Sequence, residues 1–373
     1  MMLDALAYSF VGIFLIYQII LWIWFKKTST PLSELPKYLP KVAVLVAARN
    51  EEANIDTCLQ SLTQLDYPAH LLQIYVGNDQ STDATADKME QWQQRFPNIH
   101  LIHITEILGT ARGKANVLAH LAKSTDAEFL FITDADIQVP STWVRTMLAA
   151  FRPKDGIVSG STIVEGKGAI ARVQKMDWSY AFGMVYVVSD KGFPVSAVGN
   201  NMCIRKEAYD ATGGYENLPF SITEDLELFL ATLKKGYDYR QLMQFEILAT
   251  STPQETWMKL LQQRKRWLTG ALRVPVILFA FLALQALFFP VLMLLAYWKP
   301  WFALFFYIAK VGLQYAFINE VYQRIQKRYT WKDILTFEVY SYLFPVVVII
   351  YQLWPSRIDW KGRKYTWKES QPK

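Results

Sequence analysis

The stretch Phe129-Leu-Phe-Ile-Thr-Asp-Ala-Asp136 decides the fold, because an apolar run of strand length ends there in two acidic residues. A short apolar run bounded by polar residues is typical of a buried strand. In extended backbone the side chains of Asp134 and Asp136 point to the same face. Open α/β sheets bind ligands outside the carboxyl ends of their strands. The stretch therefore predicts a central strand that ends in a pair of carboxylates at a ligand site.

The sequence around this stretch alternates between strand-like and helix-like patterns. Such alternation indicates an α/β fold with a mostly parallel, doubly wound sheet. Strands are expected at 42–47, 73–77, 100–104 and 129–133, and helices at 55–65, 84–94 and 114–123. The first two strands also end in polar residues, Arg49-Asn-Glu-Glu52 and Asn78-Asp79. We therefore expect the ends of three strands to share one site.

An uncharged segment of 21 residues, 5–25, is followed by Lys26 and Lys27. About 20 apolar residues cross a bilayer as a helix. A cleaved signal peptide, the alternative, would carry its basic residues before the apolar run. Lysines after the run place the N-terminus outside and the following residues in the cytoplasm. We therefore expect a transmembrane anchor over 1–27.

A second apolar zone, 273–355, is expected to hold two or three helices. Residues 274–298 are uncharged, whereas Lys310 and Glu338 interrupt the next two apolar segments. Charges at such depth usually face protein or water. Basic residues on both sides of the last segment favour the cytoplasm for both loops. We therefore expect that 334–354 does not cross fully, and that it lies in the interface or re-enters.

Between these zones, residues 28–272 are long enough for one large α/β domain, and 356–373 form a basic tail. The 373 residues are 52% hydrophobic and 19% charged, which excludes a disordered chain. Two cysteines allow at most one disulfide, so we expect the main domain to be cytosolic. The net charge of +6 is not gathered in a basic stripe, which argues for a membrane surface and against nucleic acid.

Carboxylates are the chemical groups that the sequence arranges most clearly. No dinucleotide, P-loop or nucleophilic-serine motif is present, and the four histidines are scattered without a cysteine partner that would indicate zinc. Asp134 and Asp136 are hard oxygen ligands that suit Mg²⁺ or Mn²⁺, with water and substrate phosphates completing the shell. Two merely solvated acids at a strand end are the alternative.

Two further motifs follow along the chain. Ser221-Ile-Thr-Glu224 has the form of a capping box that opens a helix over 225–235. Asp225 would then lie in the first turn, where the helix dipole keeps it ionised and able to accept a proton. An acid that only stabilises the helix end is the alternative. The run Gln263-Arg-Lys-Arg-Trp267 is either a set of charges flanking the membrane or a site where a cytosolic substrate meets a membrane component.

Over residues 42–267 these motifs, in this order, resemble the membrane-bound family 2 glycosyltransferases and the related ceramide-glucosyltransferase-like enzymes. The matching stretches are Ala47-Ala-Arg-Asn-Glu51, Asn78-Asp-Gln-Ser-Thr-Asp83, Arg112-Gly-Lys-Ala-Asn116, Asp134-Ala-Asp136, Gly199-Asn-Asn-Met202 with Gly213-Gly214, Thr223-Glu-Asp225 and Gln263-x-x-Arg266-Trp267. The resemblance implies a GT-A fold with N- and C-terminal transmembrane helices. It also implies an inverting, metal-dependent transfer of a sugar from a nucleoside diphosphate sugar.

The resemblance assigns roles to individual residues. Those implied to bind the nucleotide sugar are Ala48, Asn50, Glu51, Asp79, Lys114 and Asp134. Asp134 and Asp136 are implied to bind Mg²⁺ or Mn²⁺, and Asp225 to deprotonate the acceptor hydroxyl. The implied acceptor and diphosphate site comprises Glu224, Gln263, Arg266 and Trp267. Asn78 and Gln80 depart from the family's acid and glycine, so UDP and GDP both stay open, with a UDP-sugar favoured.

The acceptor is expected to be a membrane lipid, at the cytoplasmic face of a bacterial inner or plasma membrane. So few apolar segments offer little protein to line a polar path for a secreted polymer. A processive polysaccharide synthase is the alternative, since Gln-x-x-Arg-Trp also occurs in such polymerases, and an inactive nucleotide-sugar-binding scaffold is the non-enzymatic one. The stretch Trp360-Lys-Gly-Arg-Lys-Tyr365 resembles the ending of lipid-directed relatives and is expected to contact anionic headgroups.

Overall fold

The computed structural model describes residues 2–30, 32, 38–271, 276–354, 358–360 and 363–365. They form two compact units: Thr30–Gly166 with Ser196–Gly270 and Ser356–Lys373, and Met1–Ser29 with Lys167–Val195 and Ala271–Pro355. Residues 167–195 thus group with the apolar helices, whereas the division proposed from the sequence kept them within 28–272. The connector prolines Pro31 and Pro36 and most of the 356–373 tail lie outside the described residues.

The first unit is built on a seven-stranded sheet with the order β3-β2-β1-β4-β8-β6-β9. Strands β3, β2, β1 and β4 pair in parallel, β8 is antiparallel to β4 and β6, and β9 is parallel to β6. The predicted mostly parallel sheet is therefore confirmed. The strands are β1 Val42–Ala48, β2 Leu72–Asn78, β3 Ile99–His103, β4 Phe129–Asp134, β6 Asp155–Ser159, β8 Asn201–Arg205 and β9 Asp238–Gln241. A smaller sheet joins β5 Ile137–Gln138, β10 Ala249–Ser251 and β7 Thr162–Val164.

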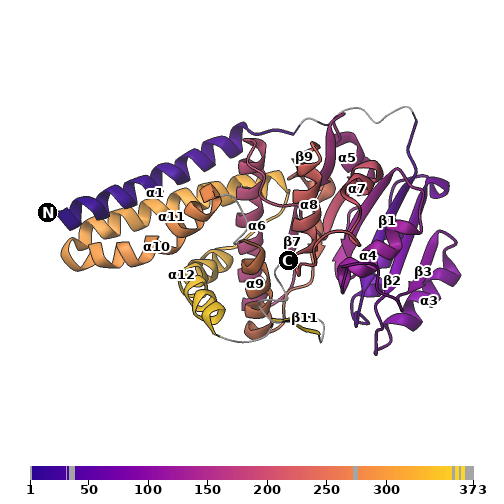
Figure 1. The fold of residues 1–373 in the computed structure, drawn as a ribbon. Coiled ribbons are helices and arrows are strands. Elements are labelled where there is room, and N and C mark those ends of the chain that lie inside the picture. The colour runs from indigo at the N-terminus through magenta and orange to yellow at the C-terminus, as the bar shows by residue number, and fades with distance from the viewer. Residues whose placement is uncertain are drawn as a thin grey trace. The chain divides into compact units, whose positions relative to one another are not determined.

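Alternate residues of β1 face two different cores, which explains why this strand is apolar throughout. Val44 lies in a cluster with α2 Ile55–Thr63, α3 Thr85–Arg95 and α5 Trp143–Ala150. Leu45 lies in a second cluster with α4 Lys114–Lys123, α7 Lys206–Thr212 and α8 Glu224–Lys234. Helices therefore cover both faces of the sheet, and the predicted doubly wound arrangement is confirmed (Figure 1).

The second unit is helical. Its helices are α1 Met2–Lys27, α6 Ala169–Asp190, α10 Val276–Trp298, α11 Pro300–Arg324 and α12 Trp331–Leu353. Helices α1, α10 and α11 lie side by side (Figure 1), and Phe14 of α1 packs on Phe288 of α10 with ring centroids 4.1 Å apart. Among the described residues, Asp4–Lys27, Pro300–Arg324 and Trp331–Leu353 are long and apolar enough to cross a membrane, and the shorter Ala283–Trp298 is also apolar. That residues 334–354 re-enter stays a prediction.

The two charges within the last apolar helices pair with each other. Lys310 Nζ lies 2.8 Å from Glu338 Oε1, and the two side chains are only 3% and 10% exposed. Gln314 Nε2 donates to Glu338 Oε2 at 3.4 Å, and the Tyr342 hydroxyl donates to Oε1. Of the two predicted surroundings for these charges, protein or water, the structure shows protein. An unpaired charge in hydrocarbon would cost several kcal/mol, so this pair holds α11 against α12.

Gly77 of β2 provides a test of the packing between the sheet and α4. A Cβ at this position would lie 2.2 Å from Val117 Cγ1 and 3.3 Å from Leu121 Cδ2. Gly77→Ala is expected to destabilise the protein by about 1–3 kcal/mol, because overpacking strains a core and β-branched Val117 has little rotamer freedom. The measurement is the thermal unfolding of the purified protein.

The added change Val117→Ala serves as the control, because it removes the atom that clashes. The double variant should therefore unfold at a higher temperature than Gly77→Ala alone. A double variant of equal or lower stability would show that this contact does not limit the approach of α4 to β2.

Candidate functional site

The carboxyl ends of β1, β2 and β4 bring the predicted donor residues to one edge of the sheet. In the parallel register Ala48 of β1 lies opposite Asn78 of β2, and Ala47 lies opposite Asp134 of β4. Residues that directly follow these strands, such as Asn50 and Asp79, therefore emerge at the same edge. This is the edge at which open α/β sheets bind their ligands.

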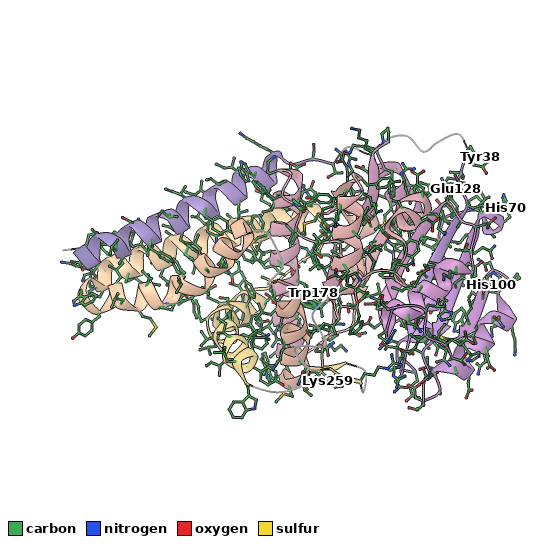
Figure 2. All side chains as sticks on the ribbon, in the orientation of Figure 1. Tyr38, His70, His100, Glu128, Trp178 and Lys259 are labelled. Carbon is green, nitrogen blue, oxygen red and sulfur yellow. The ribbon has the colours of Figure 1, made fainter. Side chains whose placement is uncertain are left out.

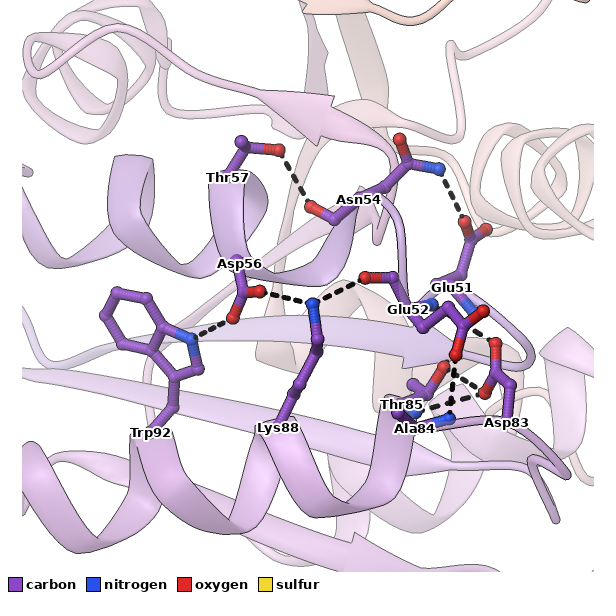
Figure 3. A network of polar contacts seen from close by, with 10 residues as sticks. All are labelled: Glu51, Glu52, Asn54, Asp56, Thr57, Asp83, Ala84, Thr85, Lys88 and Trp92. Carbon is purple, nitrogen blue, oxygen red and sulfur yellow. Dashed lines mark hydrogen bonds and ion pairs between the residues drawn. The ribbon is translucent and has the colours of Figure 1, made fainter.

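Hydrogen bonds join the loop after β1 to the loop after β2 (Figure 3). Glu51 is buried, its backbone N–H donates to Thr85 Oγ1 at 2.7 Å, and its carboxylate accepts from Asn54 Nδ2 at 2.9 Å. Asn50 has a φ of 53°, and its Oδ1 accepts from the backbone N–H of Thr82 at 2.9 Å. The two loops therefore form one connected wall beside the strand ends.

Asp79 is a second buried carboxylate of this wall, beside Glu51. Its backbone N–H donates to the carbonyl of Ala48 at 2.9 Å, and its carbonyl accepts from Arg49 Nη1 at 2.6 Å. The carboxylate forms a bidentate ion pair with Arg363, with distances of 2.8 Å and 2.9 Å. No sequence motif indicates a role for Arg363 at this site, because only the folded chain brings this residue to Asp79.

The two departures from the family pattern have structural explanations. Asn78 Oδ1 accepts from the backbone N–H of Ser81 at 3.0 Å, and its Nδ2 lies 3.1 Å from His103 Nδ1. Gln80 has a φ of 55°, the left-handed conformation that glycine adopts most easily. Asn78 therefore supports the turn, and Gln80 keeps the backbone shape of the glycine that it replaces.

Lys114 is the cation at the centre of the site. It begins α4, and its Nζ lies 2.5 Å from Asp134 Oδ1 and 2.9 Å from Glu224 Oε1. Burial acts to lower the pKa of Lys114, but the nearby carboxylates, Asp134 foremost, outweigh burial and raise it. Lys114 therefore stays charged and joins the end of β4 to the first turn of α8.

Asp225 lies in that first turn, as predicted. Its Oδ2 accepts from the backbone N–H of Gly199 at 3.0 Å, and its Oδ1 from that of Leu226 at 2.9 Å. Burial, and then the neighbouring Glu224 carboxylate, raise the pKa of Asp225 to about 6 against the opposing effect of Lys114. Such a carboxylate is ionised at neutral pH and more basic than an ordinary aspartate.

The predicted capping box of Ser221 and Glu224 is wrong. Helix α8 begins at Glu224, so its N-cap is Thr223, whose side chain makes no capping hydrogen bond to the described residues. The Ser221 hydroxyl accepts from the backbone N–H of Thr223 at 3.2 Å instead, while Glu224 pairs with Lys114. Glu224 pairs with buried Lys114 and not with the helix end, because a charge-assisted hydrogen bond to an ammonium is stronger than one to a backbone N–H.

Asp134 and Asp136 are half-buried on either side of buried Ala135. Asp134 Oδ1 faces Lys114, and Asp136 Oδ2 accepts from the Ser251 hydroxyl at 3.4 Å. In the described part of the chain, no three His, Cys, Asp or Glu residues are placed to hold a metal ion. Two carboxylates alone fit a hard divalent cation that takes its other ligands from water and phosphate oxygens.

Cysteines and histidines do not form a second site of this kind. Cys58 and Cys203 are both free and buried. Figure 2 labels His70 and His100, which come from the short helix Ala69–Leu71 and from β3, and His100 hydrogen-bonds to Gln73. The chemistry of the sheet edge therefore rests on carboxylates and on lysine and arginine.

A small cleft that is partly open to solvent lies beside Lys114. Its described lining residues come from three separate parts of the chain: Arg112, Gly113, Lys114 and Ala115; Phe220, Ser221, Ile222 and Glu224; and Arg266. Arg266 belongs to α9 Trp257–Ala271, so the arginine of the last motif reaches the same cleft as Lys114. Asp225 is not among these lining residues, although its neighbour Glu224 is.

Gln263 and Trp267 share α9 with Arg266 but are not among the described lining residues of this cleft. The guanidinium of Arg264 lies 4.4 Å above the Trp267 ring. Gln263 Oε1 is buried and accepts no hydrogen bond from the described residues. The structure thus places Arg266 on the cleft that Lys114 and Glu224 also line.

Several curated proteins are similar in sequence to this chain. Over 282 residues the chain is 27% identical to the probable glycosyltransferase YdaM of Bacillus subtilis, covering 72% of this chain and 66% of the relative. Over 247 residues it is 28% identical to the beta-monoglucosyldiacylglycerol synthase of Synechocystis, covering 62% and 48% respectively. The chain therefore spans about half to just under two thirds of the length of these curated relatives.

The fold is similar to that of the mannosyltransferase PcManGT from Pyrobaculum calidifontis, solved in complex with GDP-Man and Mn²⁺. The TM-score is 0.64 at 21% identity, covering 94% of this chain and 99% of that chain. This similarity confirms the predicted GT-A fold. The profile of Glycosyl transferase family 21, a ceramide-glucosyltransferase-like group, matches residues 5–371, which is nearly the whole sequence. The chain belongs to Glycosyl transferase family 21.

Proposed function

We propose that the protein is a membrane-bound, inverting glycosyltransferase that moves a sugar from a nucleoside diphosphate sugar to a hydroxyl of a membrane lipid. The observation that carries this proposal is the contact of Lys114 with Asp134 and Glu224, beside Asp225. Lys114 joins Asp134, at the proposed donor site, to helix α8. That helix carries Asp225, the carboxylate with a raised pKa. A transferase needs a donor site and a base at this short separation.

In the proposed donor site, the nucleoside lies against the wall formed after β1 and β2. Ala48, Asn50, Glu51 and Asp79 belong to this wall, and UDP is the favoured nucleotide. Lys114 and Asp134 lie where the diphosphate would be. Asp134 and Asp136 would hold Mg²⁺ or Mn²⁺, which when bound neutralises charge on the diphosphate. The presence of Mn²⁺ and GDP-Man in the structure of PcManGT supports a divalent cation here.

Asp225 is proposed as the general base. The acceptor hydroxyl gives its proton to the Asp225 carboxylate while its oxygen bonds to the anomeric carbon, and the bond from that carbon to the diphosphate breaks. Attack from the opposite side inverts the configuration. Glu224 is the weaker candidate, because its carboxylate is already paired with Lys114. Arg266, on the same cleft as Lys114, would offset charge on the leaving diphosphate.

The proposed acceptor is a lipid, reached from the cytoplasmic side of a bacterial membrane by a multi-pass protein. Within the described residues, three helices have the length and hydropathy to cross, which is little material for lining a polysaccharide channel. The relatives named as beta-monoglucosyldiacylglycerol synthases support a lipid acceptor. Lys26 and Lys27 after the first apolar segment favour a cytoplasmic sheet unit.

The acceptor assignment is tested by incubating the purified protein with labelled UDP-glucose or GDP-mannose and total membrane lipid. Label confined to one chloroform-soluble species is the expected result. Label in an aqueous polymer of mixed size would contradict the lipid assignment and favour the processive synthase. Nucleotide binding without any transfer would favour the inactive scaffold.

Metal dependence is expected to follow Asp134 and Asp136. Asp134→Asn and Asp136→Asn should each lower transfer by about 100-fold or more, since a bound cation stabilises developing charge by several kcal/mol. Excess chelator should do the same to the wild-type protein. Asp126→Asn is the matched control, because this exposed acid pairs only with Lys41 in the described structure and should keep full activity. Full wild-type activity in chelator would contradict the metal assignment.

The role of Asp225 is tested by Asp225→Asn. Transfer is expected to be lost while binding of the nucleotide sugar survives, because the base acts on the acceptor. Gly199→Ala should lower kcat for a related reason, since a Cβ there would lie 2.6 Å from Asp225 Oδ2 and displace the carboxylate. Near wild-type turnover by Asp225→Asn would place the base elsewhere, with Glu224 the next residue to test.

The raised pKa of Asp225 predicts the acid limb of the activity profile. The carboxyl is protonated below its pKa of about 6 and cannot then accept the hydroxyl proton. Turnover should therefore fall as the pH decreases through about 6, whereas an ordinary aspartate would act down to about pH 4. The measurement is kcat from about pH 5 to about pH 8. A profile that stays flat through this range would show that Asp225 does not titrate in the transfer step.

A further inference from the structure

The short C-terminal hairpin places Arg363 against the carboxylate of Asp79, in the wall formed by the loops after β1 and β2. Strand β11 Ile358–Trp360 pairs antiparallel with β12 Arg363–Tyr365. Arg363 Nη1 lies 2.8 Å from Asp79 Oδ2, and its Nη2 lies 2.9 Å from Oδ1. The side chain of Asp79 is 8% exposed and that of Arg363 is 29% exposed. The contact thus joins a buried acid to a partly buried guanidinium.

This geometry distinguishes the contact from an ordinary surface ion pair. Two parallel N–H···O bonds between a guanidinium and a carboxylate are charge-assisted and restrict the angle between the two groups. The backbone on each side of Asp79 is already held, by the Ala48 carbonyl and by Arg49. The remaining freedom is rotation of the side chain, and Arg363 removes it. The carboxylate consequently has one fixed orientation.

We propose that Arg363 is a positioning residue of the donor site, and that it orients Asp79 for the nucleoside of the sugar donor. This inference rests on the proposed function. A carboxylate offers about four acceptor positions, and the bidentate pair uses one on each oxygen. One position on each oxygen is left for a ribose hydroxyl or a base N–H. Arg363 and the nucleoside therefore share Asp79, and neither displaces the other.

The proposal gives the tail motif a role in donor binding. The sequence led us to expect that the stretch 360–365 contacts anionic headgroups, but its arginine contacts Asp79. Helix α12 ends at Leu353, and β11 begins at Ile358. The donor site accordingly includes a segment from the far end of the chain, 284 positions from Asp79.

The test compares Arg363→Ala and Arg363→Lys with the control Arg145→Ala. Arg145 pairs with Asp66 in the same unit, and both side chains are more exposed than Asp79. We expect Arg363→Ala to raise the dissociation constant of UDP or GDP and the KM for the nucleotide sugar by about 10-fold or more. The kcat and the KM for lipid should change little. Lysine keeps the charge but cannot make the bidentate contact of a guanidinium, so Arg363→Lys should have only part of the wild-type affinity. Arg145→Ala should bind the nucleotide as the wild type does.

The possible results separate this inference from the proposed function. If the wild-type protein binds neither UDP-glucose nor GDP-mannose, the proposed function is wrong and the inference falls with it. If the wild type binds one of them and both Arg363 variants bind it equally well, only the inference is wrong. Tighter binding by Arg363→Ala would also overturn it, because Arg363 would then be a group that the nucleotide must displace. If Arg363→Ala fails to fold, the donor KM of Arg363→Lys decides between the same results.

Discussion

The contact of Lys114 with Asp134 and Glu224 is the interaction on which the site depends. Three carboxylates, Asp134, Glu224 and Asp225, are gathered around one lysine, and without it they would repel one another in a partly desolvated space. Removing one partner of a buried ion pair typically costs about 3–5 kcal/mol, because it leaves an uncompensated charge. Gly113 supports this arrangement, since its φ of 55° lets α4 begin with Lys114 directed at β4.

The helical unit uses the same device for a different purpose. Lys310 and Glu338 are paired and almost fully buried, and Gln314 and Tyr342 donate further hydrogen bonds to the carboxylate. That pair is saturated by its own neighbours, so its effect is to hold α11 and α12 together. Lys114, by contrast, lines a cleft. The structural role of the first pair and the chemical role proposed for Lys114 thus differ in access for a ligand rather than in burial of the charges.

The sequence predicted the sheet, its flanking helices and the grouping of strand ends, because short apolar runs such as 42–47 and 129–133 are a local property of the sequence. It did not predict the partners of polar side chains. Ser221 and Glu224 have capping-box spacing, yet Glu224 turns to Lys114, which arrives from another helix. The contact of Arg363 with Asp79 was likewise not predictable, because it joins residues 284 positions apart. The sequence of α6 does not indicate its grouping with the helical unit, because its apolar residues are interspersed with polar ones and form no long hydrophobic run.

Glu224 and Asp225, two adjacent acids at the start of α8, have different partners. Glu224 forms an ion pair with the Lys114 ammonium, and this pair holds α8 near the end of β4. Asp225 accepts backbone N–H bonds from Gly199 and Leu226, and burial raises its pKa to about 6. When neighbouring acids are separated in this way, one serves structure and the other gains basicity. Burial and the Glu224 carboxylate, against the opposing effect of Lys114, therefore make Asp225 the acid suited to accept a proton, while Lys114 holds Glu224.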